Sequence, residues 1–137
     1  MKFTDMNPKV IAQFRGGGKI DGLPEGAREG LLLLTTVGRR SGRRHTTPLG
    51  RFIRDGEIYL AAGNGGEPGD PHWYLNAKAD PRVTVETSRE TYRATLVEVD
   101  DEHRARLWPS FVAEHPQIAG YEETSGRVIP ILRLARV

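Results

Sequence analysis

The sequence predicts a mainly β fold with small helices, an α+β arrangement in which about six short strands form a closed or half-closed barrel. The first observation is a succession of short segments rich in branched and aromatic residues, separated by turn residues. The second is Asp55-Gly56 between two such segments, which is a strong hairpin signal. The third is that full-length helices do not alternate with the strands, which argues against a doubly wound parallel sheet.

The first predicted element is a short amphipathic helix over residues 8–15, with Asn7 as its cap and Pro8 in its first turn. Residues 16–30 are rich in glycine and poor in apolar side chains, so we expect a connector. Residues 31–37, LLLLTTV, are an apolar run of strand length and predict a buried strand.

Further segments have the length and composition of strands. They are residues 48–54, 57–62, 82–87, 91–99 and 128–137. A flexible loop is predicted over residues 63–69, GNGGEPG, and a tight turn over residues 88–90. Pro130 lies inside the last predicted strand, which favours an edge position or a bulge there.

Two more helices are predicted in the second half of the chain. One covers residues 72–79 and follows an Asp-Pro pair that resembles a cap and first turn. The other begins after Asp100 and ends near Glu114. Pro109 lies inside it and predicts a kink or a break.

Composition narrows the classes of function. The 137 residues fit one domain over residues 1–137, with residues 1–30 as the N-terminal helix and connector. There is no cysteine, which excludes disulfides, thiolate metal sites and cysteine nucleophiles, and no pattern indicates a metal site or a catalytic triad. No stretch has the length of a transmembrane helix or the apolar core of a signal peptide, so we expect a cytoplasmic protein.

The segment between residues 38 and 44, GRRSGRR, carries four arginines within six residues. Guanidinium groups match phosphate and carboxylate with a planar fork of donors, and the glycines let backbone amides face the same anion. A solvated surface, a small anionic ligand and nucleic acid are all compatible with this arginine loop. Because Lys+Arg total 20 and Asp+Glu 18, the charge is local, which disfavours nucleic acid.

Several motifs, taken in order along the chain, resemble the deazaflavin (coenzyme F420)-dependent nitroreductase family. They are FRGGGK (14–19), LLLLTTVGRRSG (31–42), TTPL (46–49), AAGNGG (61–66), PHWYLNAKADPRVTV (71–85) and GRVIPIL (126–132). The resemblance covers the chain from about residue 7 to residue 133. It implies a split β-barrel of the FMN-binding, pyridoxamine-phosphate-oxidase-like type.

The resemblance also implies an oxidoreductase that transfers a hydride from reduced F420 to a quinone, a nitroaromatic or a similar conjugated acceptor. F420 has a phosphodiester and a glutamyl tail, so the arginine loop is a suitable receptor for its charges. The small-molecule acceptor is the expected partner, with a monomer or a homodimer as the assembly and a weak peripheral membrane contact as a further possibility. Nucleic acid is not expected to be a partner.

The resemblance implies a set of cofactor-binding residues in the arginine loop and in the segments that follow it. They are Arg39, Arg40, Ser41, Gly42, His45, Thr47, Pro48, Ala61, Ala62, Gly63, Asn64, Pro71, His72 and Trp73. We expect Tyr74 to pack in the core and Asn76 to make a structural hydrogen bond. Relatives often have Ser-Lys where this chain has Gly63-Asn64, so a hydroxyl and a positive charge are absent.

Tyr121 is the one aromatic residue that remains in the late segment, where some relatives carry several tyrosines. Its neighbours are polar and turn-like, so we expect a rim loop in which Tyr121 is either a surface residue or a lid over a ligand. As the candidate catalytic residue, Tyr121 is a proton donor or a lid. The alternatives to a reductase are a split barrel that binds flavin or F420 with no or different catalysis, and an adaptor for nucleic acid or an acidic partner.

Overall fold

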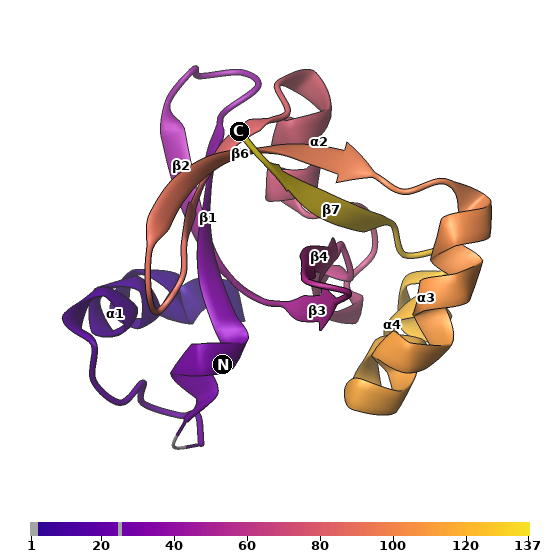
Figure 1. Ribbon diagram of the computed structural model, residues 1–137, viewed down its shortest axis with the longest axis horizontal. Coiled ribbons are helices and arrows are strands. Elements are labelled where there is room, and N and C mark those ends of the chain that lie inside the picture. The colour runs from indigo at the N-terminus through magenta and orange to yellow at the C-terminus, as the bar shows by residue number, and fades with distance from the viewer. Residues whose placement is uncertain (1–2, 25) are drawn as a thin grey trace.

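The computed structural model describes residues 3–24 and 26–137 and has a seven-stranded sheet in the order β2-β1-β5-β6-β7-β4-β3 (Figure 1). The strands are β1 (Leu31–Val37), β2 (Arg44–Gly50), β3 (Phe52–Arg54), β4 (Glu57–Ala61), β5 (Arg82–Glu86), β6 (Thr91–Glu98) and β7 (Ile131–Arg136). The α-helices are α1 (Phe3–Gly16), α2 (His72–Ala79), α3 (Asp101–Glu114) and α4 (Gln117–Ser125), and 3₁₀ turns cover Ala27–Gly30 and Asn64–Gly66. Each strand pair in the sheet is antiparallel.

The chain curls this sheet into a half-barrel. Strands β2 and β3 lie at opposite ends of the sheet, yet only Arg51 separates them in the sequence. The two sheet edges must therefore approach each other at Arg51, whose amide donates to the carbonyl of Gly30 at 3.0 Å. The curled sheet in Figure 1 confirms the predicted half-closed barrel.

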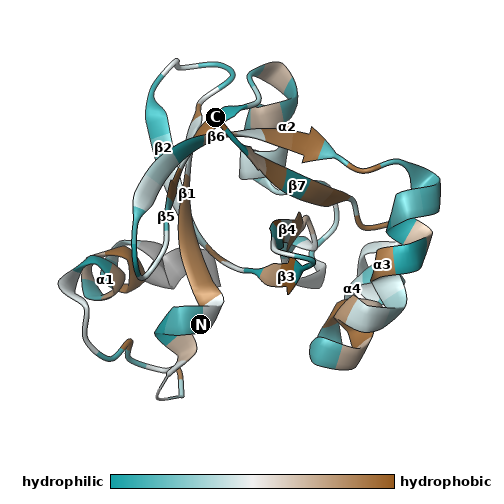
Figure 2. Ribbon diagram, viewed as in Figure 1, coloured by the Kyte–Doolittle hydropathy of each residue, from teal (hydrophilic) through white to brown (hydrophobic). Residues whose placement is uncertain are grey.

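Strand β1 is apolar along its length because both of its faces are covered. Leu32 and Leu34 point into the barrel, while Leu33, on the other face, packs with Val10 and Phe14 of α1. All three leucines have 0% exposure. β1 and β7 are accordingly brown along most of their length in Figure 2.

A second apolar cluster lies where α3 and α4 cover β3, β4 and the start of β7. The rings of Phe52 and Phe111 stack with centroids 4.0 Å apart, and Ile118 of α4 and Ile131 of β7 complete the contact. These helices therefore attach to the same part of the sheet that begins the 62–70 loop. No described helix is long and apolar enough to cross a membrane.

The structure corrects several predicted boundaries. α1 begins at Phe3, so the predicted start at Pro8 is wrong; near a helix start, proline removes only one backbone hydrogen bond. The predicted strand 48–54 is two strands, β2 and β3, and β2 begins at Arg44. α3 continues through Pro109 as one helix, so no break occurs there.

The interpretation of Pro130 is also wrong. β7 begins after it, at Ile131, and lies inside the sheet between β6 and β4, not at an edge. Proline retains a carbonyl, and this carbonyl accepts a hydrogen bond from the amide of Ala62 at 2.9 Å. The missing N–H of Pro130 is therefore of no consequence at this position.

Tyr121 lies in a helix and not in the rim loop that the sequence predicts. α4 ends at Ser125 and is capped by Gly126, whose φ of 70° is the left-handed conformation that closes many helices. Ile118 is buried and Tyr121 half-buried, one turn apart, and both pack against the second apolar cluster. This short apolar face explains why a polar segment folds as a helix here.

Candidate functional site

The arginine loop between β1 and β2 is closed by its own backbone. The amide of Gly38 donates to the carbonyl of Arg43 at 2.7 Å, and the amide of Gly42 donates to the carbonyl of Gly38 at 2.9 Å. The hydroxyl oxygen of Ser41 accepts from the amide of Arg43 at 3.1 Å and can still donate its own proton. Gly42 has a φ of 73°, which glycine adopts without strain.

Gly38 is required by the close approach of two other side chains. A Cβ atom at this position would lie 2.7 Å from Oγ of Ser41 and 2.8 Å from Nε2 of His45. The absence of a side chain at Gly38 therefore lets Ser41 and His45 converge on one side of the loop. Both of these residues line the cavity described below.

The buried amide of Asn76 holds Arg39 in place. Its Oδ1 accepts from the backbone amide of Arg39 at 3.2 Å and from Nη1 of Arg39 at 2.9 Å, and its Nδ2 donates to Oγ1 of Thr36 at 3.2 Å. Asn76 is 3% exposed and Thr36 1% exposed. The guanidinium of Arg39 also lies 3.5 Å from Nδ1 of His72. Arg39 is thus oriented by side chains of α2.

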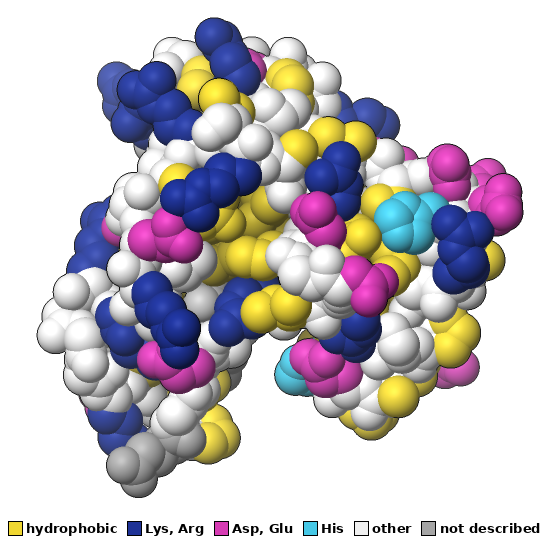
Figure 3. All heavy atoms as spheres, viewed as in Figure 1, with side chains coloured by type: hydrophobic (Ala, Val, Ile, Leu, Met, Phe, Trp, Pro, Cys, Tyr) yellow, Lys and Arg dark blue, Asp and Glu magenta, His cyan; other side chains and the backbone are white. Residues whose placement is uncertain are grey.

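Arg40 differs from Arg39 in having no partner. Within residues 3–24 and 26–137, its guanidinium makes no hydrogen bond or ion pair, and the same holds for those of Arg43 and Arg44. Lys and Arg side chains gather over this loop at the top of Figure 3. The loop therefore combines one oriented guanidinium with free guanidinium groups beside it.

An open cavity of about 460 Å³ lies between the arginine loop, β2 and α2. Its lining residues are Thr36, Gly38, Arg39, Arg40, Ser41, His45, Thr46, Thr47, His72, Trp73 and Asn76. The lining combines guanidinium, hydroxyl and imidazole groups with one indole, and Trp73 is otherwise buried in the core. This set of donors fits the phosphodiester and carboxylates of F420.

The remaining predicted residues form a second group at the 62–70 loop. Ala62 is buried at the end of β4, and the loop that follows begins with Gly63. The ring of Tyr121 lies directly against this loop, because a Cβ atom at Gly63 would be 2.9 Å from Cδ2 of Tyr121. Tyr121 is therefore neither a bare surface residue nor a residue of a flexible loop.

The predicted site residues are thus divided between two places. Arg39, Arg40, Ser41, His45, Thr47, His72 and Trp73 line the cavity, whereas Gly42, Pro48, Ala61, Ala62, Gly63, Asn64, Pro71 and Tyr121 do not. Pro71 immediately precedes α2, so this helix connects the two groups.

Sequence reasoning missed two lining residues, Thr36 and Thr46. Gly38 was expected in the anion-binding loop, and the structural hydrogen bond predicted for Asn76 is confirmed, although its partners were not predicted. Thr36 could have been found from the alternation of β1, where it shares the inward face of Leu32 and Leu34. A hydroxyl in such a position needs a buried partner. That partner, Asn76, lies on a different element and is not visible in the local pattern.

Tyr74 packs in the main core, as predicted. Burial and the hydrogen bond that its hydroxyl donates to Glu98 raise the pKa of Tyr74 well above its usual value. The phenol therefore stays protonated and is a structural anchor for α2 on β6.

The chain is similar to known proteins along most of its length. A model of the F420H(2)-dependent quinone reductase family matches residues 8–135. A protein of Mycobacterium tuberculosis named F420H(2)-dependent quinone reductase is 37% identical over 127 residues, which are 89% of this chain and 80% of the relative.

Two solved structures are also similar in sequence. One, described as an F420-H2 dependent reductase, has a TM-score of 0.68 and 33% identity, covering 77% of this chain and 93% of its own. The other, described as a domain-swapped dimer, has a TM-score of 0.70 and 30% identity over 97% of this chain and 99% of its own.

A putative pyridoxamine 5'-phosphate oxidase from Listeria innocua has a TM-score of 0.55 at 10% identity, over 94% of this chain and 91% of its own. This likeness concerns the fold alone and agrees with the predicted split β-barrel. The match over residues 8–135 and the 37% identity decide the family. The chain belongs to the F420H(2)-dependent quinone reductase family.

Proposed function

We propose that this chain transfers a hydride from reduced F420 to a quinone, and that nitroaromatic or similar conjugated acceptors can take the quinone's place. Membership of the family identifies the protein as an oxidoreductase that depends on reduced F420. The acceptor and the hydride step are the parts that we add. The observation that carries the proposal is an oriented Arg39 beside a free Arg40 in one cavity.

The cofactor supplies the hydride, and the protein binds and orients the two reactants. In this proposal Arg39, Arg40, Ser41, His45 and Thr47 bind the phosphodiester and the glutamyl tail. Gly42 and Pro48 shape the backbone of that half of the site. The charged contacts are remote from the reacting ring, so they contribute binding energy and fix its position.

The ring-binding half of the proposed site comprises Ala61, Ala62, Gly63, Asn64, Pro71, His72 and Trp73. In this proposal the flat ring approaches the backbone at the small residues that end β4, and the indole of Trp73 offers an apolar face. Tyr121 packs against Gly63, which places its ring at the border of this region. We propose that it contacts the acceptor or donates a proton to the reduced product.

Titration with F420 and with FMN is the first test of this proposal. Tighter binding of F420 is expected, and equal or tighter binding of FMN would favour the alternative, a flavin-binding split barrel without this activity. Arg40→Ala should weaken F420 binding because it removes a free guanidinium from the cavity. Arg89→Ala is the matched control, since it removes one positive charge from the exposed turn after β5.

A hydride-transfer assay with F420H2 and a menadione-type quinone tests the chemistry. Controls with NADPH and with FMNH2 in place of F420H2 should give no comparable rate. Binding of F420 without reduction of any quinone would leave a binding protein and contradict the proposed reaction. A nitroaromatic compound in the same assay tests the wider acceptor range.

A further inference from the structure

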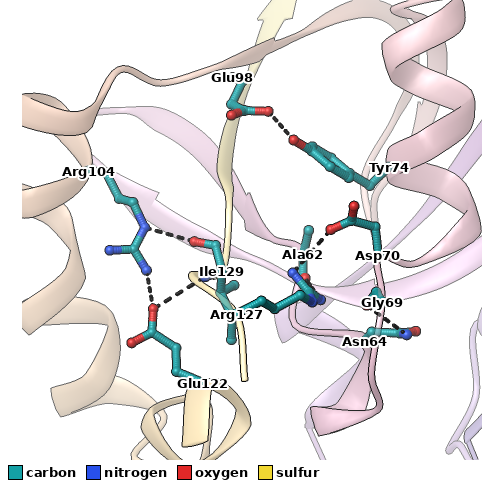
Figure 4. A network of polar contacts seen from close by, with 10 residues as sticks. All are labelled: Ala62, Asn64, Gly69, Asp70, Tyr74, Glu98, Arg104, Glu122, Arg127 and Ile129. Carbon is teal, nitrogen blue, oxygen red and sulfur yellow. Dashed lines mark hydrogen bonds and ion pairs between the residues drawn. The ribbon is translucent and has the colours of Figure 1, made fainter. Parts of the chain in front are cut away.

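Arg127, which lies between α4 and β7, bridges the two ends of the 62–70 loop (Figure 4). Its Nη2 donates to the carbonyl of Ala62 at 2.6 Å, and its Nη1 lies 3.2 Å from Oδ1 of Asp70. The Arg127 side chain is 17% exposed and that of Asp70 is 36% exposed, so water screens the ion pair in part from the Asp70 side. One guanidinium thus fixes the position where the loop leaves β4 and the position where it reaches α2.

The ion pair with Asp70 also fixes the start of α2. Asp70 is followed by Pro71 and then by His72 and Trp73, both of which line the cavity. Inside the loop, Nδ2 of Asn64 donates to the carbonyl of Gly69 at 3.2 Å. Displacement of Asp70 would therefore move both the loop and the side chains that α2 presents to the cavity.

Helix α4 packs against the same loop through Thr124 and Tyr121. Oγ1 of Thr124 donates to the carbonyl of Gly66 at 3.0 Å, and a Cβ atom at Gly66 would lie 2.7 Å from this hydroxyl oxygen and 3.1 Å from Cδ1 of Tyr121. With the contact between Tyr121 and Gly63, two glycines of the loop lie under two side chains of one helix. The loop is held at its ends by Arg127 and at its centre by α4.

Helix α3 supports this arrangement through a second arginine. Nε of Arg104 donates to the carbonyl of Ile129 at 2.8 Å, and its Nη2 donates to Glu122 of α4. The same carboxylate accepts from the amide of Ile129 at 3.2 Å (Figure 4). The short segment that carries Arg127 is therefore tied to α3 and α4 on its far side.

We infer that Arg127 is a positioning residue, which holds the 62–70 loop and the start of α2 in the geometry that the ring of F420 requires. The inference rests on the proposed function for its consequence in catalysis. Its structural part does not, because the bridge consists of contacts within the chain. Nη2 of Arg127 donates to the carbonyl of Ala62, and Nη1 faces the carboxylate of Asp70 as an ion pair. Nε and Nη1 are buried and make no hydrogen bond among the described residues. Arg127 thus contacts the loop at both of its ends, and its role in this proposal is to position the loop.

Hydrogen exchange of the ligand-free protein tests the structural part. In Arg127→Gln, amides of residues 63–75 should exchange at least about tenfold faster, because a lost charged hydrogen bond is worth that factor. Amides of β1 and β6 should keep their rates. Arg133→Gln is the matched control, since Arg133 makes an ion pair with Glu57 at 3.5 Å, away from the loop. Unchanged exchange in residues 63–75 would overturn the inference.

Two further variants keep the test decisive if Arg127→Gln does not fold. Asp70→Asn breaks the same ion pair from the other side, and Arg127→Lys keeps the charge but cannot bridge both acceptors with a planar fork. We expect faster exchange of the loop in Asp70→Asn and an intermediate rate in Arg127→Lys. Wild-type rates in both variants would contradict a positioning role.

Kinetics test the functional part. Arg127→Gln should lower kcat at saturating F420H2 by about tenfold or more, because a misplaced ring reacts slowly even when bound. Arg127→Lys should recover part of this loss, and Arg133→Gln should match the wild type. Faster exchange of the loop amides together with an unchanged kcat would refute the positioning role. Failure of the wild-type protein to bind F420 would instead refute the proposed function, and the result of the exchange experiment would still stand.

Discussion

Asn76→Ala is the substitution that most directly tests how the arginine loop is built. The side chain of Asn76 makes three hydrogen bonds, two with Arg39 and one with Thr36. The exposed Arg39 can be rehydrated when the amide is removed, whereas the hydroxyl of Thr36, which is 1% exposed, loses its partner in the core. Neutral hydrogen bonds contribute about 1 kcal/mol and charged ones about 1.5–3 kcal/mol, so we expect a loss of about 2–4 kcal/mol in the free energy of unfolding.

The same substitution should also weaken F420 binding. Without Asn76, the guanidinium of Arg39 is no longer oriented and must be ordered when the ligand binds. Ordering such a side chain costs about 0.5–1.5 kcal/mol, which corresponds to a dissociation constant raised about 2- to 12-fold. Urea denaturation measures the first effect, and titration of the folded variant with F420 measures the second.

Asn76→Asp separates orientation from stability. The carboxylate can still accept from Arg39 and from the hydroxyl of Thr36, so this variant should unfold at a urea concentration nearer to that of the wild type. Because the carboxylate neutralises Arg39, it should nevertheless bind F420 more weakly. If Asn76→Ala is destabilised but both variants bind F420 as the wild type does, Arg39 has no role in binding and the reasoning is refuted.

Three other predictions follow from single side chains. Arg40→Ala should raise the KM for F420H2 and leave kcat nearly intact, since uniform binding is lost, and collapse of kcat with unchanged binding would give this arginine a chemical role. If Tyr121 donates a proton, Tyr121→Phe should be as damaging as Tyr121→Ala. If its ring stacks on the acceptor, Tyr121→Phe should be tolerated and Tyr121→Ala should lose about 1–3 kcal/mol of transition-state stabilisation. Wild-type kinetics in both variants would exclude both roles. Tyr74 has a raised pKa in the folded state, mainly through burial, so its contribution is complete below the unfolded pKa and declines as the pH rises through and above about 10. Tyr74→Phe should therefore reduce the alkaline loss of stability by up to about 1.4 kcal/mol per pH unit, measured by urea denaturation between pH 9 and 11, and an unchanged slope would contradict the shift.

The sequence predicts well those elements whose patterns are local. β1, α2, β5 and β6 were expected within one or two residues because an apolar run or a clean alternation lies between clear turn residues. The division of residues 48–54 into β2 and β3 was not predicted. β2 pairs with β1 at one end of the sheet and β3 pairs with β4 at the other end. This pairing depends on contacts between distant segments, which a local sequence pattern does not indicate.

Helix α4 was missed for a related reason. Its apolar face consists of little more than Ile118 and Tyr121, and Gly120 lowers its helix propensity. The contacts of this helix with α3 and with the 62–70 loop stabilise it in the folded protein. A segment whose helical state depends on distant partners reads as a polar turn when the sequence is taken alone.

In the candidate site, too, locally encoded features were predicted and those that depend on distant contacts were not. The arginine loop is visible in the sequence because charge and glycine are concentrated there, and family membership confirms the predicted cofactor, fold and enzyme class. The partners that orient the arginine loop and the 62–70 loop are not visible in this way: a structural hydrogen bond was expected from Asn76, but not to Arg39, and no role was expected for Arg127. Arg39 is held by Asn76, which lies 37 positions further along the chain, and Ala62 is held by Arg127, which lies 65 positions further along.

These two supports should have different effects in the same titration. Asn76 acts on the cationic half of the site, so its variants should change the dissociation constant of F420 and the dependence of binding on salt, which screens exposed charges. Arg127 acts on the uncharged half, so its variants should lower kcat and leave the salt dependence as in the wild type. A salt series with Asn76→Ala and Arg127→Gln in parallel distinguishes the two, with Arg133→Gln as the common control. An equal change of salt dependence in both variants would show that the two halves do not bind separate parts of the cofactor, and the division of the site proposed above would be wrong.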